Sequence, residues 1–256
     1  MKELQDMKAI VTGASSGIGQ AIAIAYAHAG ADVVISYCQN KKGADKTLAL
    51  IEAAGRKAKA IRVDMANLSE LQEFLKEGIE FLGGIDIFVN NAGTVTRHAD
   101  FLEIPLDAFD RVQAVNLKAP FMITQLVGKY MQKQRKGGSI INISSVSASI
   151  ISPGLTHYEC SKAALNMLTR ASASASAKYH IRVNAIAPGL VETNINQTQR
   201  EHQPEVWEKR KTMIPLERVG KPEDIADVAI LLASNKSAWI TGDIIPVDGG
   251  ISLKIS

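Results

Sequence analysis

Short runs of β-branched and apolar residues alternate along the chain with longer segments that have helical periodicity. Several of these runs are almost continuously apolar, which is typical of strands buried on both faces of a sheet. Strands and helices that alternate through short connections form a parallel sheet with helices packed on both faces. No linker rich in Pro, Gly or Ser divides the 256 residues. The sequence therefore predicts a single α/β domain, 1–256, built on a doubly wound parallel sheet of about seven strands.

The strands are expected at Lys8–Thr12, Asp32–Tyr37, Lys59–Val63, Ile85–Asn90, Ser139–Ser144, Ile181–Ile186 and Asp243–Val247. The helices are expected at Gly17–Ala29, Lys41–Ala54, Leu68–Phe81, Leu106–Gln134, Tyr158–Tyr179 and Pro222–Leu232. The segment Leu190–Arg218 is polar and charge-mixed, and it is too long for an ordinary connection. We expect this segment, 190–218, to be a lid or substrate-binding loop within the domain.

The composition is that of an ordinary soluble globular protein, with 46% hydrophobic and 21% charged residues. The net charge is only +3 and there is no basic block, so neither nucleic acid nor a membrane surface is an expected partner. No apolar run has the length of a membrane span, and a strand that begins at Lys8 leaves no room for a signal peptide. Cys38 and Cys160 make no disulfide framework, and the five histidines lack metal-ligand spacing. We therefore expect no metal and a cytoplasmic location.

Tyr158 and Lys162 are four residues apart in YECSK, within a segment of helical pattern. Residues at i and i+4 share one face of a helix, so the ammonium is expected beside the phenol. A nearby cation lowers the pKa of a tyrosine from its ordinary value of about 10. The pair is therefore a candidate general base, although the same spacing also occurs in ordinary surface pairs.

The run TGASSGIG, Thr12–Gly19, directly follows the first expected strand and opens the first helix. Glycines at such a turn let the backbone bend sharply and approach a ligand, and the helix start favours an anion such as pyrophosphate. The spacing is G-x-x-x-G-x-G rather than the G-x-G-x-x-G of the common dinucleotide fingerprint. We interpret the run as a phosphate-binding loop, and the alternative is a turn that only packs the helix on the strand.

The end of the second expected strand indicates which ribose is recognised. A carboxylate there would bind the 2′-hydroxyl of NAD, and a cation would accept the 2′-phosphate of NADP. The chain has neither a carboxylate nor an arginine between Ser36 and Asn40, which favours NADP modestly, with Ser15, Asn40 and Lys41 available to a phosphate. Asp64, after the third expected strand, is placed either to meet an adenine ring or to cap the following helix.

Other polar residues end expected strands or interrupt an expected helix. NNAG, Asn90–Gly93, ends the fourth strand, where its amides can hold backbone or face a cofactor. Asn116 lies inside a helical pattern, where an amide is unfavourable unless it has a task such as bending the helix or holding a water. Ser144 and Ser145 end the fifth strand, where a hydroxyl can lie beside a substrate oxygen.

In this order, TGASSGIG, NNAG, VNL around Asn116, NISS, YECSK and NAIAPGLVET resemble, over essentially the whole chain, the motifs of the short-chain dehydrogenase/reductase family. The resemblance implies a Rossmann-type fold with NAD(P) as cofactor. It also implies a catalytic tetrad of Asn116, Ser145, Tyr158 and Lys162, with Ser145 preferred to Ser144 because it precedes Tyr158 by 13 positions. The cofactor site that it implies is lined by Gly13, Ser15, Ser16, Gly17, Ile18, Gly19, Tyr37, Cys38, Asp64, Met65, Asn91, Ala92, Gly93, Tyr158, Lys162, Pro188, Gly189, Val191 and Thr193.

In an enzyme of this family Tyr158 would exchange the proton of the alcohol, and Lys162 would lower the pKa of Tyr158 and grip the nicotinamide ribose. Ser145 would bind the substrate oxygen, and Asn116 would support a water beside Lys162. The resemblance further implies a small-molecule substrate and a homo-oligomer, most commonly a tetramer. We expect NADP to be used at least as well as NAD.

The nearest resemblance is to bacterial sugar and polyol dehydrogenases of the glucose 1-dehydrogenase type. The alternative is a 3-oxoacyl-acyl-carrier-protein reductase, for which Lys133, Arg135 and Lys136 form a candidate basic docking patch near the entrance to the site. An alternative of another class is a non-catalytic dinucleotide sensor, which would have no need of a base.

Overall fold

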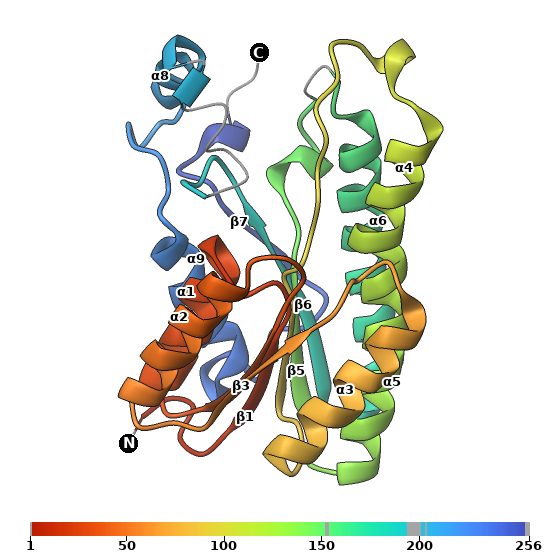
Figure 1. Cartoon of the computed structure of the whole chain (residues 1–256), viewed down its shortest axis with the longest axis vertical. Helices are drawn as coiled ribbons and strands as arrows, with labels where there is room; N and C mark the ends of the chain where they lie inside the picture. Colours follow the sequence, from red (N-terminus) through yellow and green to blue (C-terminus); the bar gives the residue numbers. More distant parts are fainter. Residues whose placement is uncertain (1, 152–153, 194–200, 203, 254–256) are drawn as a thin grey trace.

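The computed structural model describes residues 2–151, 154–193, 201–202 and 204–253, and one seven-stranded sheet forms its centre (Figure 1). All neighbouring strands are parallel, in the order β3-β2-β1-β4-β5-β6-β7. The strands are β1 Lys8–Val11, β2 Asp32–Tyr37, β3 Ala58–Arg62, β4 Ile87–Asn90, β5 Gly138–Ile143, β6 Ile181–Pro188 and β7 Ile244–Val247. Every expected strand is confirmed, with its ends within two residues of the expected ones.

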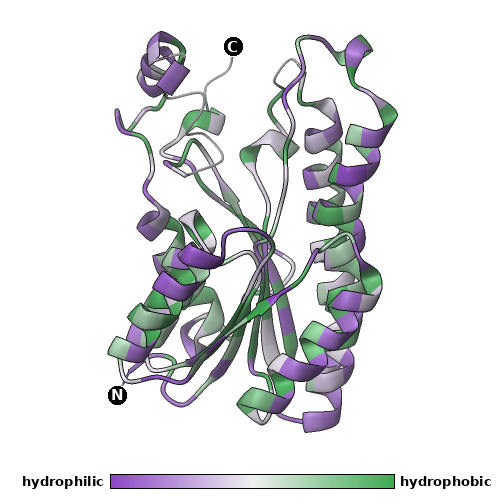
Figure 2. Cartoon of the chain, viewed as in Figure 1, coloured by the Kyte–Doolittle hydropathy of each residue, from purple (hydrophilic) through white to green (hydrophobic). Residues whose placement is uncertain are grey.

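Helices cover both faces of this sheet (Figure 1). One face is covered by α1 Gly17–His28, α2 Lys41–Ala53 and α9 Pro222–Ala233, and the other by α3 Leu68–Leu82, α5 Ala119–Gln134 and α6 Thr156–Ser176. In β1, Ala9 and Val11 belong to the core on the first face, and Ile10 belongs to the core on the second. Because both faces are buried, the strands are rich in apolar residues, although β5 and β6 also contain polar ones such as Asn142 and Asn184. Figure 2 accordingly shows green stretches along the sheet with purple and white ones between them.

The helical span expected at Leu106–Gln134 is confirmed at both ends, but it is not one regular α-helix. The structure has α4, Leu106–Gln113, then a π-helical turn, Ala114–Lys118, and then α5. Such π turns are rare in proteins, and those that do occur are often found at functional sites. Asn116 is the middle residue of this turn, which agrees with the expectation that its amide interrupts the helix.

The ends of α3 follow from local sequence. The side chain of Asn67 accepts a hydrogen bond from the N–H of Ser69 at 3.2 Å and so caps the first turn. Gly83 ends the helix in the left-handed conformation, with φ of 68°. Asp64 is therefore not the cap of this helix, and that interpretation of Asp64 is wrong.

The order of the strands reverses between β1 and β4, since the chain runs outward from β1 to β3 and then returns to the other side of β1. Ligands of open parallel sheets bind outside the carboxyl ends of the strands at such a reversal. The two loops that leave β1 and β4 here are Thr12–Gly19 and Asn91–Asp100. No helix of the described residues is long and apolar enough to cross a membrane.

The segment 190–218 contains an additional helix that the sequence did not predict, α8 Pro204–Thr212. Residues 194–200 and 203 of the segment lie outside the described residues. Trp207 of α8 and Ile214 after it are both buried. The described part of the segment is therefore packed, at these two side chains, rather than extended into solvent.

Candidate active site

The glycine-rich run forms the turn between β1 and α1. Gly13 has φ of 64°, and a Cβ atom there would lie 2.8 Å from the Cα of Ala92 in the loop after β4. A Cβ atom on Gly19 would lie 2.7 Å from the carbonyl oxygen of Gly13. Only glycine therefore permits this close approach. Ser16, the N-cap of α1, makes no side-chain capping hydrogen bond to a described residue, so the first N–H groups of the helix are open to an anion.

Asn91 holds this turn in place. Its Nδ2 donates to the carbonyl oxygens of Thr12 at 2.8 Å and Gly13 at 3.1 Å. The backbone N–H groups of Asn91 and Ala92 both donate to Oγ1 of Thr12 at 3.0 Å. The amide expected to line the cofactor site thus shapes the turn that would bind the pyrophosphate.

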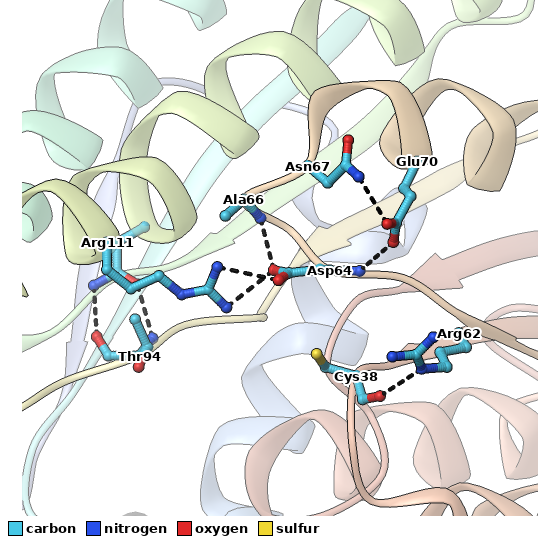
Figure 3. A network of polar contacts seen from close by, with 9 residues as sticks. Cys38, Arg62, Asp64, Ala66, Asn67, Glu70, Thr94 and Arg111 are labelled. Atoms are coloured by element: carbon cyan, nitrogen blue, oxygen red, sulfur yellow. Dashed lines mark hydrogen bonds and ion pairs between the residues drawn. The ribbon is translucent and has the colours of Figure 1, made fainter. Parts of the chain in front are cut away.

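The end of β2 carries the groups expected to distinguish the two cofactors. Tyr37 pairs in register with Arg62 of β3, and Nε of Arg62 donates to the carbonyl oxygen of Cys38 at 3.2 Å (Figure 3). The expectation that no arginine lies here is wrong, because Arg62 arrives from the neighbouring strand. Lys41, a candidate partner for a phosphate, is paired with Asp45 at 2.8 Å.

Asp64 lies at the end of β3, facing α4 (Figure 3). Arg111 of α4 donates to both of its carboxylate oxygens, at 3.0 and 3.1 Å, and the N–H of Ala66 donates at 2.9 Å. Burial opposes ionisation of Asp64, but these hydrogen bonds outweigh it and lower the pKa of the carboxyl. Asp64 is therefore an ionised, oriented group at the carboxyl edge of the sheet.

Tyr158 and Lys162 lie one turn apart near the start of α6. Nζ of Lys162 is 5.6 Å from the centre of the Tyr158 ring and donates to the carbonyl oxygen of Ile143, the last residue of β5, at 2.8 Å. Only 5% of Lys162 is exposed. Burial lowers the pKa of this ammonium to about 8. The lysine is thus held at the strand end rather than solvated.

Ser145 follows β5 and is hydrogen-bonded to the side chain of Tyr158. Its Oγ also accepts from the N–H of Ser147 at 3.1 Å. Oγ of Ser144 instead donates to Oδ1 of Asn166 at 2.6 Å. The structure therefore brings Ser145, and not Ser144, to the tyrosine, in agreement with the spacing that the resemblance implies.

The pKa of Tyr158 departs from the expectation. Burial raises this pKa, and the hydrogen bond with Ser145 and the positive charge of Arg97 offset the rise only in part. The expected net lowering by Lys162 is not found. The physical reason is that burial penalises the phenolate, while the ammonium of Lys162 is bonded to the carbonyl oxygen of Ile143.

Asn116 joins the loop after β4 to α6. Its Oδ1 accepts from the N–H of Thr94 at 2.8 Å, and its Nδ2 donates to the carbonyl oxygen of Thr94 at 2.9 Å and to Oγ of Ser161 at 3.1 Å. Both amide hydrogens are used, so they do not serve the water that the resemblance implied. A Cβ atom on Gly93 would lie 3.4 Å from Oδ1 of Asn116 and 3.7 Å from Nζ of Lys162, which places the end of NNAG against the tetrad.

The residues expected on the other side of the cofactor site lie at the end of β6 and directly after it. Pro188 is the last residue of β6, and Gly189 comes directly after it. Val191 is buried, with 4% exposed. Cγ2 of Thr193 would lie 3.3 Å from a Cβ atom on Gly17. The chain after β6 thus returns to the glycine-rich turn, as expected for residues that enclose one ligand.

The remaining expected cofactor residues contribute backbone or packing. The carbonyl oxygen of Ser15 accepts from Nδ2 of Asn40 at 3.3 Å, which ties the turn to the start of α2. Ile18 packs against the core on the α1 face, and Met65 is buried in the core on the α3 face. The side chain of Met65 therefore faces the protein, and only its backbone is available to a cofactor.

Comparisons with known proteins find reductases and dehydrogenases that are similar to this chain. A family model described as Enoyl-(Acyl carrier protein) reductase matches residues 13–252. The chain is 39% identical to an L-rhamnose 1-dehydrogenase (NAD(P)(+)) of Sphingomonas sp. (strain SKA58), over 100% of both chains. It is 38% identical to a 3-oxoacyl-acyl-carrier-protein reductase of Thermotoga maritima, over 97% of this chain and 98% of the relative.

A solved structure with the same fold contains a nucleotide. The protein, described as a 2-deoxy-D-gluconate 3-dehydrogenase of Agrobacterium tumefaciens with bound NADP, is 36% identical and superposes with a TM-score of 0.89 over 98% of each chain. The chain belongs to the short-chain dehydrogenase/reductase family. As a member of that family it is an NAD(P)-dependent oxidoreductase that acts on CH–OH groups.

The residues of this short-chain dehydrogenase/reductase fit a dinucleotide. The turn after β1 has no room for side chains at Gly13 and Gly19, and the N-terminus of α1 is open. Glu70 and Arg111 orient the backbone and the carboxylate of Asp64 at the edge where an adenine would lie. Among the described residues, no group of three or more His, Cys, Asp or Glu side chains could hold a metal ion.

Sequence reasoning missed three residues near this site. Arg62 was overlooked because it reaches the end of β2 only through the pairing of β3 with β2 in the sheet, and not through its position in the chain. His157 precedes Tyr158 and is buried, with Nε2 2.8 Å from Oγ1 of Thr96. Arg97 stands four positions after NNAG, and its charge acts on Tyr158. The position of Arg97 in the loop that follows a site motif was the available signal.

Proposed function

We propose that this short-chain dehydrogenase/reductase transfers a hydride between NAD(P) and the secondary alcohol or ketone of a sugar or polyol, with Tyr158 as acid and base. The observation that carries the proposal is the hydrogen bond between Ser145 and Tyr158 beside the buried ammonium of Lys162. An ordinary surface tyrosine has neither partner. The nicotinamide supplies the hydride chemistry when bound.

Each side chain has a defined role in this proposal. Tyr158 accepts the alcohol proton during oxidation and returns it during reduction. Ser145 donates to the substrate oxygen where negative charge develops. Lys162, held by the carbonyl oxygen of Ile143 at 2.8 Å, places a positive charge beside the phenol and a donor where the ribose would lie. Asn116 fixes the loop that borders these groups.

The sugar class is supported by the L-rhamnose 1-dehydrogenase that matches over the whole chain. The alternative, an acyl-carrier-protein reductase, needs a basic surface near the entrance to the site. Gln134, inside the basic patch Lys133–Lys136, bonds to both backbone groups of Ile85 at 2.7 and 2.9 Å. Ile85 precedes β4, so this patch lies at the amino edge of the sheet, opposite the tetrad. The assembled tetrad also argues against a non-catalytic sensor.

The expected preference for NADP belongs to this proposal. Arg62 supports it, because the hydrogen bond to Cys38 uses Nε and leaves the two Nη groups of the fork for a 2′-phosphate. No carboxylate opposes the phosphate at the end of β2. Lys41 contributes less than expected because Asp45 neutralises it.

We also propose that the segment 190–218 is the substrate lid. It leaves β6 at the carboxyl edge of the sheet, and its helix α8 carries a buried Trp207 among charged residues. Hydrogen exchange measured with and without cofactor and substrate tests this. Equal protection of α8 in both states would reduce the segment to a surface excursion.

We also propose that the protein is a homotetramer. Apolar side chains that lie exposed on the helices of one face of the sheet support this proposal. These are Leu106, Phe109, Phe121 and Met167 on α4, α5 and α6. Large exposed apolar patches mark interfaces between proteins, and closed symmetric assemblies are their usual outcome. The cytoplasmic location remains a prediction from the sequence.

A steady-state screen tests the proposed function. Sugars, polyols and acetoacetyl thioesters are offered with NADP and NAD, in both directions, to the wild type and to Tyr158→Phe. We expect turnover of at least one sugar or polyol that depends on Tyr158. Turnover of the thioesters alone would replace the sugar class by the reductase alternative, and turnover that survives in Tyr158→Phe would overturn the role of the tyrosine.

A further inference from the structure

Arg111 of α4 and Asp64, which follows β3, form a two-point ion pair (Figure 3). Nη1 and Nη2 of Arg111 lie 3.1 and 3.0 Å from the two carboxylate oxygens of Asp64. The side chains of Arg111 and Asp64 are 48% and 37% exposed. Ion pairs this exposed contribute little to stability, but the paired N–H donors of a guanidinium fix the plane of a carboxylate. The pair therefore orients Asp64 more than it stabilises the fold.

The backbone of Asp64 is held separately, from α3 (Figure 3). Its N–H donates to Oε2 of Glu70 at 2.9 Å, and Nδ2 of Asn67 donates to Oε1 of the same carboxylate at 2.7 Å. Two helices thus meet at one residue, since α3 fixes the backbone of Asp64 and α4 fixes its side chain. An arrangement in which a second set of side chains supports the first is typical of a binding site.

The helix that presents Arg111 is itself tied to the catalytic residues. Two positions after Arg111, Nε2 of Gln113 donates to the carbonyl oxygen of His157 at 2.9 Å, and His157 directly precedes Tyr158. Asn116, in the π turn that continues α4, is bonded to Thr94 as described above. The guanidinium of Arg111 therefore reaches Asp64 from a support that is fixed relative to α6 and to the loop after β4.

The hydrogen bonds of Asp64 leave one acceptor site on its carboxylate. An ionised carboxylate has about four lone-pair sites, two on each oxygen. Oδ1 accepts from Nη2 of Arg111 and from the N–H of Ala66, and Oδ2 accepts from Nη1 of Arg111. No other described residue donates to this carboxylate. One site, on Oδ2, thus remains for a donor from outside the described residues.

A purine base differs in what it offers to such a site. Adenine carries an exocyclic amino group, which donates, whereas hypoxanthine carries an oxygen at the same position, which only accepts. A carboxylate with no proton binds the amino group and repels the oxygen. Asp64 lies at the carboxyl edge of the sheet, where dinucleotides bind in folds of this type. The base of the cofactor is therefore the donor that fits the open site.

We propose that Arg111 is a positioning residue for the cofactor, which turns the open acceptor site of Asp64 toward the amino group of adenine and so makes the enzyme select adenine over hypoxanthine. The inference rests on the expectation that Asp64 meets the adenine ring, and it assigns the selectivity to a residue on another helix. Without Arg111 the carboxylate would have three open acceptor sites and would be free to turn into solvent. Its ionised form would remain, but its direction would be lost.

Titrations with two forms of the cofactor test this inference. NADP and nicotinamide hypoxanthine dinucleotide phosphate differ only at the base, so the ratio of their Kd values cancels the contribution of the 2′-phosphate. Isothermal titration gives this ratio for the wild type, Arg111→Gln, Asp64→Asn and the double variant. Lys59→Gln is the matched control, because Lys59 of β3 also pairs with a carboxylate, Glu77 of α3, at 2.8 Å and with similar exposure.

We expect the wild type to bind the adenine form more tightly by about tenfold or more, as befits a hydrogen bond to a charged group. Arg111→Gln should weaken binding of the adenine form and reduce the ratio to less than about threefold, with less effect on the hypoxanthine form. Lys59→Gln should keep the wild-type ratio. Because Arg111 acts through Asp64, the double variant should match Asp64→Asn alone.

Three results would overturn the inference. Equal affinity of the wild type for the two bases would show that no base selectivity exists for Arg111 to control. Equal weakening of both forms by Arg111→Gln would reduce the arginine to a structural role, which does not distinguish one base from the other. An effect of Arg111→Gln that persists in the Asp64→Asn background would show that the arginine does not act through Asp64. Urea midpoints that match between Arg111→Gln and Lys59→Gln would support the inference, because lost stability would not explain the lost selectivity.

Discussion

The side chain of Asn116 and the backbone of Thr94 exchange two hydrogen bonds, one in each direction, at 2.8 and 2.9 Å. Asn116 lies in the π turn between α4 and α5, and Thr94 lies in the loop after β4. The π turn therefore does more than interrupt a helix. It presents an amide that fixes the loop bordering the tetrad, and Ser161 of α6 accepts the remaining amide hydrogen at 3.1 Å.

Asn116→Ala should cost both stability and activity. It would leave the N–H and carbonyl groups of Thr94 without their partner, and a buried unsatisfied group costs about 1–3 kcal/mol. Asn184→Ala is the matched control, because Asn184 is also buried and also clamps backbone, at Ile240 and Asp243, away from the tetrad. Urea unfolding should show similar losses for both variants, whereas only Asn116→Ala should lower kcat, by about tenfold or more. Equal effects of both variants on kcat would reduce Asn116 to a general structural role.

Tyr158→Phe should keep cofactor binding and lose nearly all turnover. Phenylalanine preserves the ring and deletes the oxygen that is bonded to Ser145. Tyr130→Phe, at a partly exposed tyrosine of α5, is the control for the loss of a hydroxyl. The Kd for NADP from fluorescence titration and kcat from steady-state rates are compared. A Tyr158→Phe enzyme that keeps more than about a tenth of kcat, a barrier change of about 1.4 kcal/mol or less, would remove the tyrosine from the acid/base role.

Ser145→Ala should move the pH profile of oxidation to higher pH. Oxidation needs the phenolate of Tyr158, so its rate rises as pH passes the pKa of that group. Burial raises this pKa and the hydrogen bond with Ser145 lowers it. Loss of the bond therefore raises the pKa and shifts the rising limb of kcat/KM upward in pH. Ser144→Ala deletes a neighbouring hydroxyl that is bonded to Asn166 and should leave the midpoint in place. Identical midpoints in the two variants would contradict the assignment of Ser145.

Much of the fold was predictable because its signals are local. Parallel strands buried on both faces are rich in apolar residues, and Asn67 and Gly83 mark the ends of α3 in the sequence. Helix α8 gave no such signal, since its residues are mostly charged and only Trp207 is buried. The π turn was indicated only by the amide at Asn116, because one unusual turn does not disturb a long helical pattern.

The residues of the candidate site also divide into those that the local sequence signals and those that it does not. The motifs around Tyr158 and Lys162 were readable because the i to i+4 spacing is local. Arg62 reaches the end of β2 through the register of the sheet, which a single sequence does not contain. The direction of the Tyr158 pKa was wrong for a related reason: burial is a property of the packed chain, and here it exceeds the effect of neighbouring charges.

Light scattering at micromolar concentration should give about four times the mass of one chain, in keeping with the proposed tetramer. Phe121→Glu and Met167→Glu place charges on the exposed apolar surface of α5 and α6 and should reduce that mass. Leu50→Glu makes the same change on α2, on the opposite face of the sheet, and should leave the mass unchanged. A monomer mass for the wild type would refute the prediction.

The last prediction concerns the choice between the two cofactors. The wild type should use NADP at least as well as NAD, and the preference should weaken with added salt because Arg62 is exposed and an exposed contact is screened. Arg62→Leu should weaken binding of 2′,5′-ADP by about tenfold, or about 1.4 kcal/mol, while binding of 5′-ADP stays the same. Lys41→Gln is the control and should change little, because Asp45 already pairs with Lys41.

Cys38→Asp should swing the ratio of kcat/KM toward NAD. The new carboxylate would repel a 2′-phosphate and could bind the ribose 2′-hydroxyl. It would also form an ion pair with Arg62, whose Nε already bonds to the backbone of Cys38. The charge of Arg62 would then be neutralised, and the new carboxylate would also repel the 2′-phosphate. The double variant with Arg62→Leu should therefore differ little from Cys38→Asp alone. A wild type that favours NAD by about a hundredfold, or about 2.7 kcal/mol, would show that neither Arg62 nor the missing carboxylate governs this pocket.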